Sequence, residues 1–227
     1  MILLPRLYAI VDAAFFSTPE EAVTFAEELL AGGCTLLQYR NKSGNSRVIL
    51  EQALVLRRHS RAKPAPSAGS GQALSLPKGA PAPHVPPKLI MNDRADLGLA
   101  AEFDGVHVGQ DDLSPESVRR IIGPECWLGV STHNPEQIQA ADRTSADYLA
   151  IGPVFSTLSK DKPDPVVGLD GVRRARQQTR KPLVAIGGIT RANAASVIEA
   201  GADSVAVISD LLREPRKSAE EFFRILR

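Results

Sequence analysis

The feature that most constrains the fold is a strict alternation of short apolar runs with helical segments along the chain. Runs of strand length are predicted at 7–11, 34–39, 89–91, 106–108, 127–130, 148–151, 183–186 and 204–208. Helices are predicted between and after them, at 19–31, 47–59, 97–102, 114–122, 135–143, 171–179, 192–200 and 218–226. A strand, a helix and a short return to the next strand is typical of a parallel sheet.

Local signals support the predicted helix ends. Thr18 stands as an N-cap before Pro19, and Glu21 follows three residues after the cap. Ser114 and Asn134 are placed in the same way before two later helices. Eight such units predict an α/β fold of the (β/α)8 TIM-barrel type. A doubly wound open sheet is the alternative, but such sheets usually have fewer strands.

One segment does not follow the alternation. Residues 62–88 contain 7 of the 17 prolines and 3 of the 17 glycines, and the remainder is mostly Ala, Ser and Lys. This composition predicts a disordered insertion between the second helix and the third strand. A helix-to-strand loop of a barrel lies away from the active site. We therefore expect one barrel domain over 1–227 whose insertion is dispensable for activity.

Charge and hydropathy exclude several classes of protein. Net charge is +1, from 27 basic and 26 acidic residues, which argues against nucleic acid or an anionic membrane as a partner. No apolar run is long enough to span a bilayer, and the N-terminus lacks a signal-peptide pattern. Cys34 and Cys126 do not form a CxxC pair, so we expect reduced thiols. The sequence predicts a cytoplasmic protein.

Because a barrel carries its active site at the carboxyl ends of its strands, the residues that follow each strand are the candidates. The second strand leads into Gln38, Arg40 and Lys42, which share one side at a period of two. Two cations so placed suit a polyphosphate. A solvated basic strand end is the alternative.

Carboxylates follow the third and fourth strands. Asn92 and Asp93 follow one, and Gln110, Asp111 and Asp112 follow the other. Carboxylates on adjacent strands can share one Mg²⁺, which proteins usually hold through one or two carboxylates and the substrate's phosphates. Asp111 and Asp112 could instead serve as negative charge at the start of the next helix.

The later strands offer hydroxyls, glycines and one further cation. Ser131 and His133 follow the fifth strand, where His133 could be an acid–base group or an ordinary loop residue. His107 lies within a strand and is expected to be a satisfied core residue. A long polar loop after the sixth strand, within 148–171, carries the donors that suit phosphate: Ser156, Thr157, Ser159 and Lys160.

The seventh and eighth strands are followed by a phosphate-binding pattern. Gly187 and Gly188 let backbone N–H groups approach an anion, and Ser209 follows the last strand. Barrels commonly hold phosphate at these two loops. A plain turn is the alternative. Two anion sites at one mouth predict two phosphorylated substrates, one of them a diphosphate whose departure drives the reaction.

The sequence resembles the thiamine phosphate synthase family. The resemblance covers nearly the whole chain except 62–88. Its motifs are Leu-Tyr-Ala-Ile-Val-Asp at 7–12, Gln-Tyr-Arg-Asn-Lys at 38–42, Asn-Asp-Arg at 92–94, Gly-Val-His-Val-Gly-Gln-Asp-Asp-Leu at 105–113, Gly-Val-Ser-Thr-His at 129–133, Gly-Pro-Val-Phe-Ser-Thr-Leu-Ser-Lys at 152–160, Ala-Ile-Gly-Gly-Ile at 185–189 and Val-Ile-Ser at 207–209. The resemblance implies a Mg²⁺-dependent transferase that joins hydroxymethylpyrimidine diphosphate to a thiazole phosphate, or its carboxylated form, and releases diphosphate.

The same resemblance implies residue roles. Metal binding falls to Asp93 and Asp112, and the catalytic residues would be Arg40, Ser131 and Lys160. The residues expected at the substrates are Gln38, Arg40, Lys42, Asn92, Gln110, Ser131, Thr157, Ser159, Lys160, Gly188, Ile208 and Ser209. Two positions depart from the family pattern: Asn41 replaces an acidic residue, and Ser159 replaces Thr but keeps a hydroxyl.

Two rival functions remain. A related barrel that isomerises a thiazole phosphate would use His133 and would not need the diphosphate residues. A non-catalytic sensor would bind a phosphorylated ligand without turnover. The sequence leaves open the oligomeric state, with a homo-oligomer among the options, and whether the loop at 148–171 closes over substrate.

Overall fold

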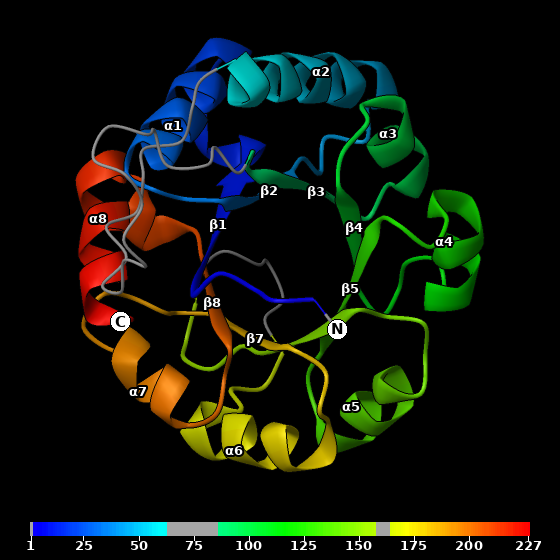
Figure 1. Ribbon diagram of the computed structural model, residues 1–227, viewed down its shortest axis with the longest axis vertical. Helices are drawn as coiled ribbons and strands as arrows, with labels where there is room; N and C mark the ends of the chain where they lie inside the picture. Colours follow the sequence, from blue (N-terminus) through cyan, green and yellow to red (C-terminus); the bar gives the residue numbers. More distant parts are fainter. Residues whose placement is uncertain (1, 63–85, 158–163) are drawn as a thin grey trace, which may run out of the picture.

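The computed structural model describes residues 2–62, 86–157 and 164–227, and within them the strands close into a parallel barrel (Figure 1). Each strand pairs with its neighbours in chain order, and β1 pairs with both β2 and β8. The strands are β1 (Leu7–Asp12), β2 (Leu36–Arg40), β3 (Lys88–Asn92), β4 (Gly105–Val108), β5 (Trp127–Thr132), β6 (Tyr148–Ile151), β7 (Leu183–Ile186) and β8 (Ser204–Val207). The predicted (β/α)8 barrel is confirmed, and the open-sheet alternative is wrong.

Helices surround the strands as an outer ring (Figure 1). They are α1 (Pro19–Ala31), α2 (Ser46–Ala62), α3 (Ala95–Ala100), α4 (Pro115–Ile122), α5 (Pro135–Asp142), α6 (Gly168–Gln178), α7 (Ala194–Glu199) and α8 (Pro215–Ile225). Two short 3-10 helices, η1 (Ala13–Phe15) and η2 (Ser209–Leu211), follow β1 and β8. Thr18, Ser114 and Asn134 accept backbone hydrogen bonds at the starts of α1, α4 and α5, as the sequence predicts.

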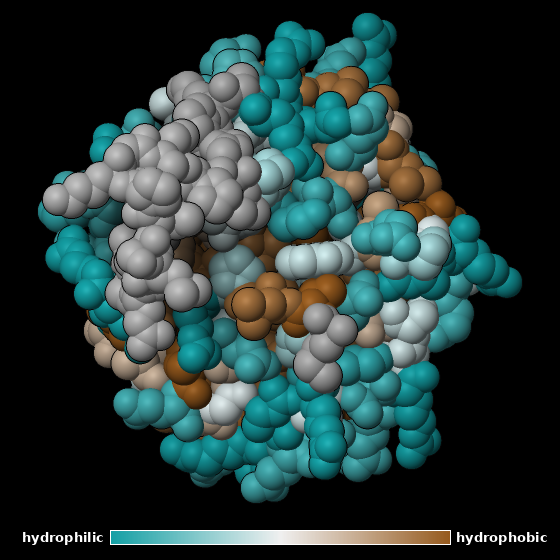
Figure 2. Space-filling view, viewed as in Figure 1, coloured by the Kyte–Doolittle hydropathy of each residue, from teal (hydrophilic) through white to brown (hydrophobic). Residues whose placement is uncertain are grey.

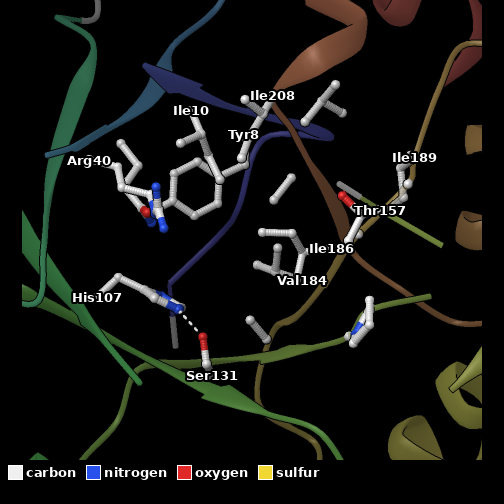
Figure 3. A pocket seen from close by; sticks show the side chains of 18 of the residues that line it. Tyr8, Ile10, Arg40, His107, Ser131, Thr157, Val184, Ile186, Ile189 and Ile208 are labelled. Carbon is white, nitrogen blue, oxygen red and sulfur yellow. Dashed lines mark hydrogen bonds between the residues drawn. The ribbon is translucent and has the colours of Figure 1, made fainter. Parts of the chain in front are cut away.

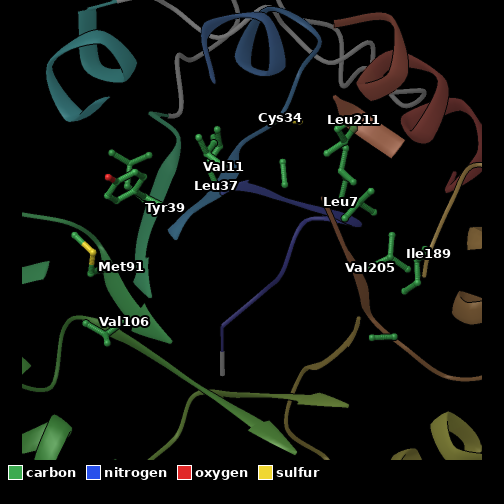
Figure 4. Close-up of a cluster of buried hydrophobic side chains, with 14 of the residues drawn as sticks. Leu7, Val11, Cys34, Leu37, Tyr39, Met91, Val106, Ile189, Val205 and Leu211 are labelled. Atoms are coloured by element: carbon green, nitrogen blue, oxygen red, sulfur yellow. The ribbon is translucent and has the colours of Figure 1, made fainter. Parts of the chain in front are cut away.

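The strands separate two buried clusters. Leu7, Leu37 and Met91 point outward into the larger cluster, between the barrel and its helices (Figure 4). Tyr8, Ile90 and Tyr148 point inward into the smaller one, which fills the barrel. Because successive strand residues face opposite sides, each strand serves both clusters. Near-continuous apolar runs are therefore what a parallel strand buried on both faces requires.

Several element ends differ from those expected. β5 continues through Ser131 and Thr132, and β3 includes Asn92. These polar residues belong to the strands themselves. The first polar residue after an apolar run is therefore not a sign that the strand has ended. Cys34 precedes β2, because its N–H still bonds to Leu29 O at the end of α1. α3 begins at Ala95, α6 at Gly168 and α8 at Pro215, each earlier than expected.

The expected insertion at 62–88 lies mostly outside the described residues, which omit 63–85. Its two ends belong to regular elements: Ala62 closes α2 and Lys88 begins β3. Asp104 holds both flanks together. Its carboxylate accepts from Arg61 Nη2 at 2.8 and 3.0 Å, from Lys88 Nζ at 3.0 Å and from Leu89 N at 2.9 Å. The chain therefore leaves and re-enters the barrel at one fixed point.

The face seen in Figure 2 is hydrophilic over much of its surface, with hydrophobic residues gathered near its middle.

Leu4 is buried with the inner cluster just before β1, so the N-terminal residues close the amino end of the barrel. Within 2–62, 86–157 and 164–227, we find no helix with the length and hydrophobicity that a bilayer crossing needs.

Candidate functional site

A cavity of about 140 Å³, partly open to solvent, lies within the barrel toward the carboxyl ends of the strands (Figure 3). All eight strands contribute side chains to it. Of the expected site residues, those that line this cavity are Gln38, Arg40, Asn92, Ser131, Thr157, Gly188, Ile208 and Ser209. The structure thus brings together residues that lie far apart in the sequence.

Arg40 is held by a carboxylate that the sequence analysis did not assign to the site. Its Nη1 lies 2.5 Å from Asp12 Oδ2, and Asp12 is only 2% exposed. Asp12 also accepts from Ala14 N in the turn after β1, which fixes the carboxylate. The position of Asp12, at the carboxyl end of a barrel strand, is the signal that could have identified it. The ion pair orients the guanidinium toward the cavity before any ligand binds.

Lys42, Asp93 and Asp112 form a second charged group just beyond the ends of β2, β3 and β4, outside the lining of the cavity. Lys42 Nζ is paired with Asp93 Oδ2, and Gly109 N donates to Asp112 Oδ2 at 2.8 Å. Burial raises the pKa of the Asp93 carboxyl above its ordinary value, neighbouring Asp112 adds to the rise, and Lys42 opposes it. Asp93 also has a φ of 61°, in the left-handed region that few residues other than glycine adopt. Two carboxylates are therefore held close together despite their mutual repulsion.

This pair fits the donor set that Mg²⁺ uses. Mg²⁺ commonly binds one or two carboxylates and completes its shell with water and substrate phosphate. Within the described part of the chain there is no group of three or more His, Cys, Asp or Glu side chains arranged for a metal ion. Asp111 is exposed, whereas Asp112 is partly buried. Asp93 and Asp112 are therefore the pair whose chemistry fits the ion.

Asn92 contributes a polar atom without a protein partner. Its Nδ2 is buried, lines the cavity region and has no hydrogen bond to any residue that the structure describes. Buried amides are nearly always bonded. A ligand with an acceptor atom at this position would satisfy Asn92.

The wall opposite Arg40 consists of apolar side chains and of the backbone of two glycines. Ile186, Ile189 and Ile208 line it, across the cavity from Arg40 (Figure 3). Gly187 and Gly188 both have positive φ, at 100° and 63°. A Cβ on Gly188 would lie 2.5 Å from Ser156 O, so a glycine is required there. The loops after β6 and β7 pack against each other at this point.

One expected feature of this wall differs. A helix was expected from Ala192, close enough for its dipole to act on a phosphate. α7 instead begins at Ala194, after a turn in which Asn193 accepts from Thr190 N and donates to Gly188 O. The 3-10 helix η2 starts directly at Ser209. Anion binding at this wall would therefore rest on loop backbone groups rather than on a long helix.

The loop after β6 is tied at both ends. Val167 N donates to Pro153 O and Gly168 N to Val154 O, while Phe155 N donates to Gly187 O. Thr157 lies in the cavity lining. Ser159 and Lys160, expected at the phosphates, lie outside the described residues.

His133 and Gln110 complete the fifth-strand side. His133 Nδ1 lies 2.6 Å from Gly152 O and its Nε2 lies 3.5 Å from Asp164 Oδ2. Both ring nitrogens therefore face the base of the loop after β6. Gln110 Nε2 donates to Ser131 O at 2.6 Å, which places Gln110 against the backbone of β5.

Asn41, the departure from the family pattern, faces away from the cavity. Its Nδ2 donates to Tyr39 Oη at 3.0 Å and to Gln52 Oε1 at 2.9 Å, and its Oδ1 accepts from Ser43 N. Asn41 thus shapes the turn after β2 through its hydrogen bonds to Tyr39, Gln52 and Ser43. Its replacement of an acidic residue leaves the second charged group unchanged.

Comparison with known proteins gives consistent results. The family model described as thiamine monophosphate synthase matches residues 84–211. The thiamine-phosphate synthase of Koribacter versatilis is 58% identical over 226 residues, which covers 98% of this chain and 96% of that protein. The thiamine-phosphate synthase of Chloroflexus aurantiacus is 43% identical, over 90% of this chain and 83% of that protein.

A solved structure agrees with these relatives. The thiamine phosphate pyrophosphorylase of Pyrococcus furiosus superposes with a TM-score of 0.77 at 31% identity, covering 97% of this chain and 95% of that one. The match covers both the charged side and the glycine side of the cavity. The chain belongs to the thiamine monophosphate synthase family.

Proposed function

We propose that this chain joins 4-amino-2-methyl-5-hydroxymethylpyrimidine diphosphate to hydroxyethylthiazole phosphate and releases diphosphate, which yields thiamine phosphate. Membership of the family supports this reaction. The observation that carries it is the two-sided cavity, in which a charged side faces a glycine and apolar side. A reaction between a diphosphate and a monophosphate needs two different anion sites at one mouth.

The charged side suits the leaving diphosphate. Arg40 and Lys42 supply positive charge, and Asn92 Nδ2 supplies an unbonded donor. Two unit charges 4 Å apart interact by about 4 kcal/mol at an effective dielectric constant near 20. Because Asp12 fixes the Arg40 guanidinium in advance, little reorganisation is needed as negative charge develops on the leaving group.

Asp93 and Asp112 would hold Mg²⁺ in this proposal. The bound ion would neutralise charge on the diphosphate oxygens. Asp93 is paired with Lys42 in the structure, so the same carboxylate serves the cation side chain and the proposed metal. The raised pKa of Asp93 follows from burial beside Asp112, which a divalent cation would relieve.

The glycine side suits the thiazole phosphate. Gly188, Ile208 and Ser209 form this part of the lining, and Ile186 and Ile189 offer an apolar surface to a heteroaromatic ring. Backbone N–H groups at positive-φ glycines can approach an anion closely. The wall would hold the nucleophile in reach of the carbon that it attacks.

The chemical step balances without a further reactant. The bond between the pyrimidine methylene carbon and the diphosphate oxygen breaks, and its electron pair leaves with diphosphate. The ring nitrogen of the thiazole then supplies its lone pair to form the new carbon–nitrogen bond. Gln38 and Ser131 would hold the pyrimidine, while Arg40 and Lys42 stabilise the departing charge. The cytoplasmic location expected from the sequence belongs to this proposal.

Incubation of the purified chain with both substrates and Mg²⁺ tests the proposal. We expect thiamine phosphate, detected as its fluorescent oxidation product, and we expect EDTA to abolish its formation. Absence of product with correctly folded protein would contradict the proposal, and undiminished product in EDTA would contradict the metal site.

A control variant separates the isomerase alternative. His133→Asn should retain most of the synthase activity, because His133 nitrogens face Gly152 O and Asp164 at the loop base. A thiazole isomerase would instead lose its acid–base group. Isomerisation of a thiazole phosphate that disappears in His133→Asn, together with no synthase product, would favour that rival.

A further inference from the structure

A chain of hydrogen bonds crosses the inside of the barrel and ends at the cavity. Gln38 Nε2 donates to Tyr8 Oη at 2.9 Å, and Tyr8 Oη lies 3.0 Å from Tyr148 Oη. Tyr148 Oη lies 3.1 Å from His107 Nδ1, and His107 Nε2 lies 2.8 Å from Ser131 Oγ. We call these five residues the polar chain. They come from β2, β1, β6, β4 and β5 in that order.

The polar chain is built into an otherwise apolar interior. Tyr8 and Tyr148 belong to the inner cluster and His107 is buried beside them, while Tyr8 and His107 also line the cavity. A buried polar group without a partner costs about 1–3 kcal/mol. Satisfied networks of this kind tend to specify one arrangement.

The strand register makes room for the chain. Gly129 on β5 pairs with His107 on β4 and with Tyr148 on β6, so the three residues lie side by side. A Cβ at Gly129 would lie 2.1 Å from Tyr148 Cζ and 2.4 Å from His107 Nδ1. The absence of a side chain at 129 therefore allows Tyr148 and His107 to meet across β5.

Donor and acceptor counting gives the chain a direction. Tyr8 accepts from the Gln38 amide, so among its two partners in the structure only Tyr148 can take its single hydroxyl proton. With this direction, Tyr148 would donate its own proton to His107 Nδ1. A neutral imidazole that accepts at Nδ1 carries its proton on Nε2, and Nε2–H donates to Ser131 Oγ.

Ser131 is left with a free proton at the end of the chain. Among the described residues, His107 is the hydrogen-bond partner of Ser131 Oγ, and it already donates to that oxygen. Ser131 lines the cavity, where His107 and Ser131 face it together (Figure 3). The hydroxyl proton can therefore serve an acceptor atom of a ligand.

We propose that Tyr8, Tyr148 and His107 are positioning residues, which fix Ser131 as a hydrogen-bond donor to a ring nitrogen of the heteroaromatic substrate. The proposal rests on the proposed function for the identity of that ring. With the opposite polarity, Ser131 would donate to His107 and would offer an acceptor to the ligand. The polar chain thus decides whether this end of the cavity selects a lone pair or an N–H group.

The electrostatics of His107 leave its ring with a single proton, as the proposed direction requires. Burial lowers the pKa of His107 to about 4, so the ring is neutral at physiological pH. Burial also raises the pKa values of Tyr8 and Tyr148 above their ordinary range, so both keep their protons. Tyr8, Tyr148 and His107 can therefore each donate one hydrogen bond and accept one within the polar chain.

The tautomer can be measured in the free protein. ¹⁵N chemical shifts of histidine-labelled protein distinguish Nε2–H from Nδ1–H, and the His107→Gln variant identifies the His107 signals by their loss. We expect His107 as the Nε2–H tautomer. An Nδ1–H tautomer would overturn the proposal, whether or not the protein makes thiamine phosphate.

Two tyrosine variants provide a matched pair for this experiment. Tyr8→Phe removes the proton that fixes the direction, so a second His107 tautomer should appear. Tyr39→Phe removes a buried hydroxyl that bonds to Gln52 on the outer side of the barrel, so His107 should keep its wild-type signals. A single unchanged tautomer in Tyr8→Phe would contradict the role of the tyrosines.

Kinetics test whether the chain acts through Ser131. Tyr148→Phe should raise KM for the pyrimidine diphosphate roughly tenfold, the effect of about one hydrogen bond to the ligand, and leave KM for the thiazole phosphate unchanged. Ser131→Ala should cause a similar loss. The double variant should lose no more than Ser131→Ala alone, because both changes remove the same interaction.

The double variant also distinguishes positioning from simple structural damage. Losses that multiply would mean that Tyr148 acts independently of Ser131, and the proposal would fail. An equal rise in KM for the pyrimidine diphosphate and for the thiazole phosphate in Tyr148→Phe would also contradict the proposal. Wild-type protein without product would instead contradict the proposed function, and the ¹⁵N measurement would then decide the polarity alone.

Discussion

The two sides of the cavity recognise anions by different means. On the side formed by β2, β3 and β4, charged side chains are held by partners: Arg40 by Asp12, and Lys42 by Asp93. On the side formed by β7 and β8, the recognition elements are backbone groups at Gly187 and Gly188 beside isoleucines. The first side depends on which side chains are present. The second depends on the space that is open because Gly187 and Gly188 have no side chain.

This difference explains why the two substrates can share one mouth. Fixed cations favour the ligand with more negative charge, and they act over several ångströms. Backbone donors act at contact distance and favour shape. A diphosphate and a monophosphate would therefore sort to opposite walls without a barrier between them.

Arg40→Met should give the largest effect on the charged side. Loss of a preorganised cation at the leaving group should lower kcat/KM by about 10²–10³. Binding of the thiazole phosphate, measured by calorimetry, should remain within a factor of about two. A comparable loss in thiazole phosphate affinity would show that the two sides are not separate.

The paired carboxylate needs its own control. Arg40→Met leaves Asp12 buried without its partner, which also lowers stability. The Arg40→Met/Asp12→Asn double variant removes that uncompensated charge. We expect it to recover thermal stability without recovering activity. Recovery of both would mean that Arg40 acts only through the fold.

Gly188→Ala should give the largest effect on the glycine side. The new Cβ would meet Ser156 O at 2.5 Å and Phe155 Cβ at 2.8 Å, so the loops after β6 and β7 must separate. KM for the thiazole phosphate should rise by about tenfold or more, while diphosphate binding stays unchanged. This estimate follows from the loss of one or two positioned contacts.

Gly168→Ala is the matched control for backbone strain. Gly168 has a φ of 65°, close to that of Gly188, but a Cβ there would meet nothing within 4 Å. The variant should lose about 1 kcal/mol of stability from strain alone, with both KM values unchanged. Equal kinetic damage in the two variants would assign the effect to strain rather than to close packing.

Asp112→Asn tests the metal proposal on the charged side. The Mg²⁺ concentration that gives half-maximal rate should rise by about tenfold, as expected for the loss of a charged ligand. Asp111→Asn is the control, because Asp111 is exposed beside Asp112 and does not contribute to the pair. An identical Mg²⁺ dependence in both variants would remove Asp112 from the metal site.

Asn41→Glu should have a small effect, within about threefold in kcat/KM. Asn41 bonds to Tyr39, Gln52 and Ser43 and lies outside the charged group. Because Glu cannot donate the two hydrogen bonds that Asn41 makes, the variant should lose about 1 kcal/mol of stability per bond rather than activity. A large gain or loss of activity would extend the charged side beyond Lys42.

The smallest effect is expected from a change to residues 63–85. Replacement of this segment by a short Gly-Ser linker should leave both KM values and kcat unchanged, since the flanks at Arg61 and Lys88 are already held by Asp104. The kinetic assay is the measurement. A folded but inactive variant would contradict the expectation that the segment is dispensable.

The barrel could be predicted because each unit carries its own evidence. Apolar runs, N-caps such as Thr18 and Asn134, and glycines at helix ends are local signals, and eight repetitions reinforce one another. Cavity residues such as Gln38 and Arg40 could be placed because strand ends of a barrel converge. Element ends were less predictable, since polar residues such as Asn92 and Ser131 continue the strands.

Partnerships across the barrel could not be predicted in the same way. The pairing of Asp12 with Arg40 depends on the register between β1 and β2, which the sequence does not state. The hydrogen bonds of His107 depend on a tyrosine from β6 and on the missing side chain of Gly129. Such contacts join different strands, so they cannot be predicted from a local sequence pattern.

The contacts of the Asp104 carboxylate with Arg61 and Lys88 have a practical consequence. Because Arg61 and Lys88 are fixed to one carboxylate, whatever joins them enters and leaves the barrel at a set point. That point lies at the amino end of β3, and the cavity lies at the carboxyl ends of the strands. A reporter protein or a surface tether grafted between Ala62 and Lys88 would leave the mouth facing solution, so the chain is suited to oriented immobilisation.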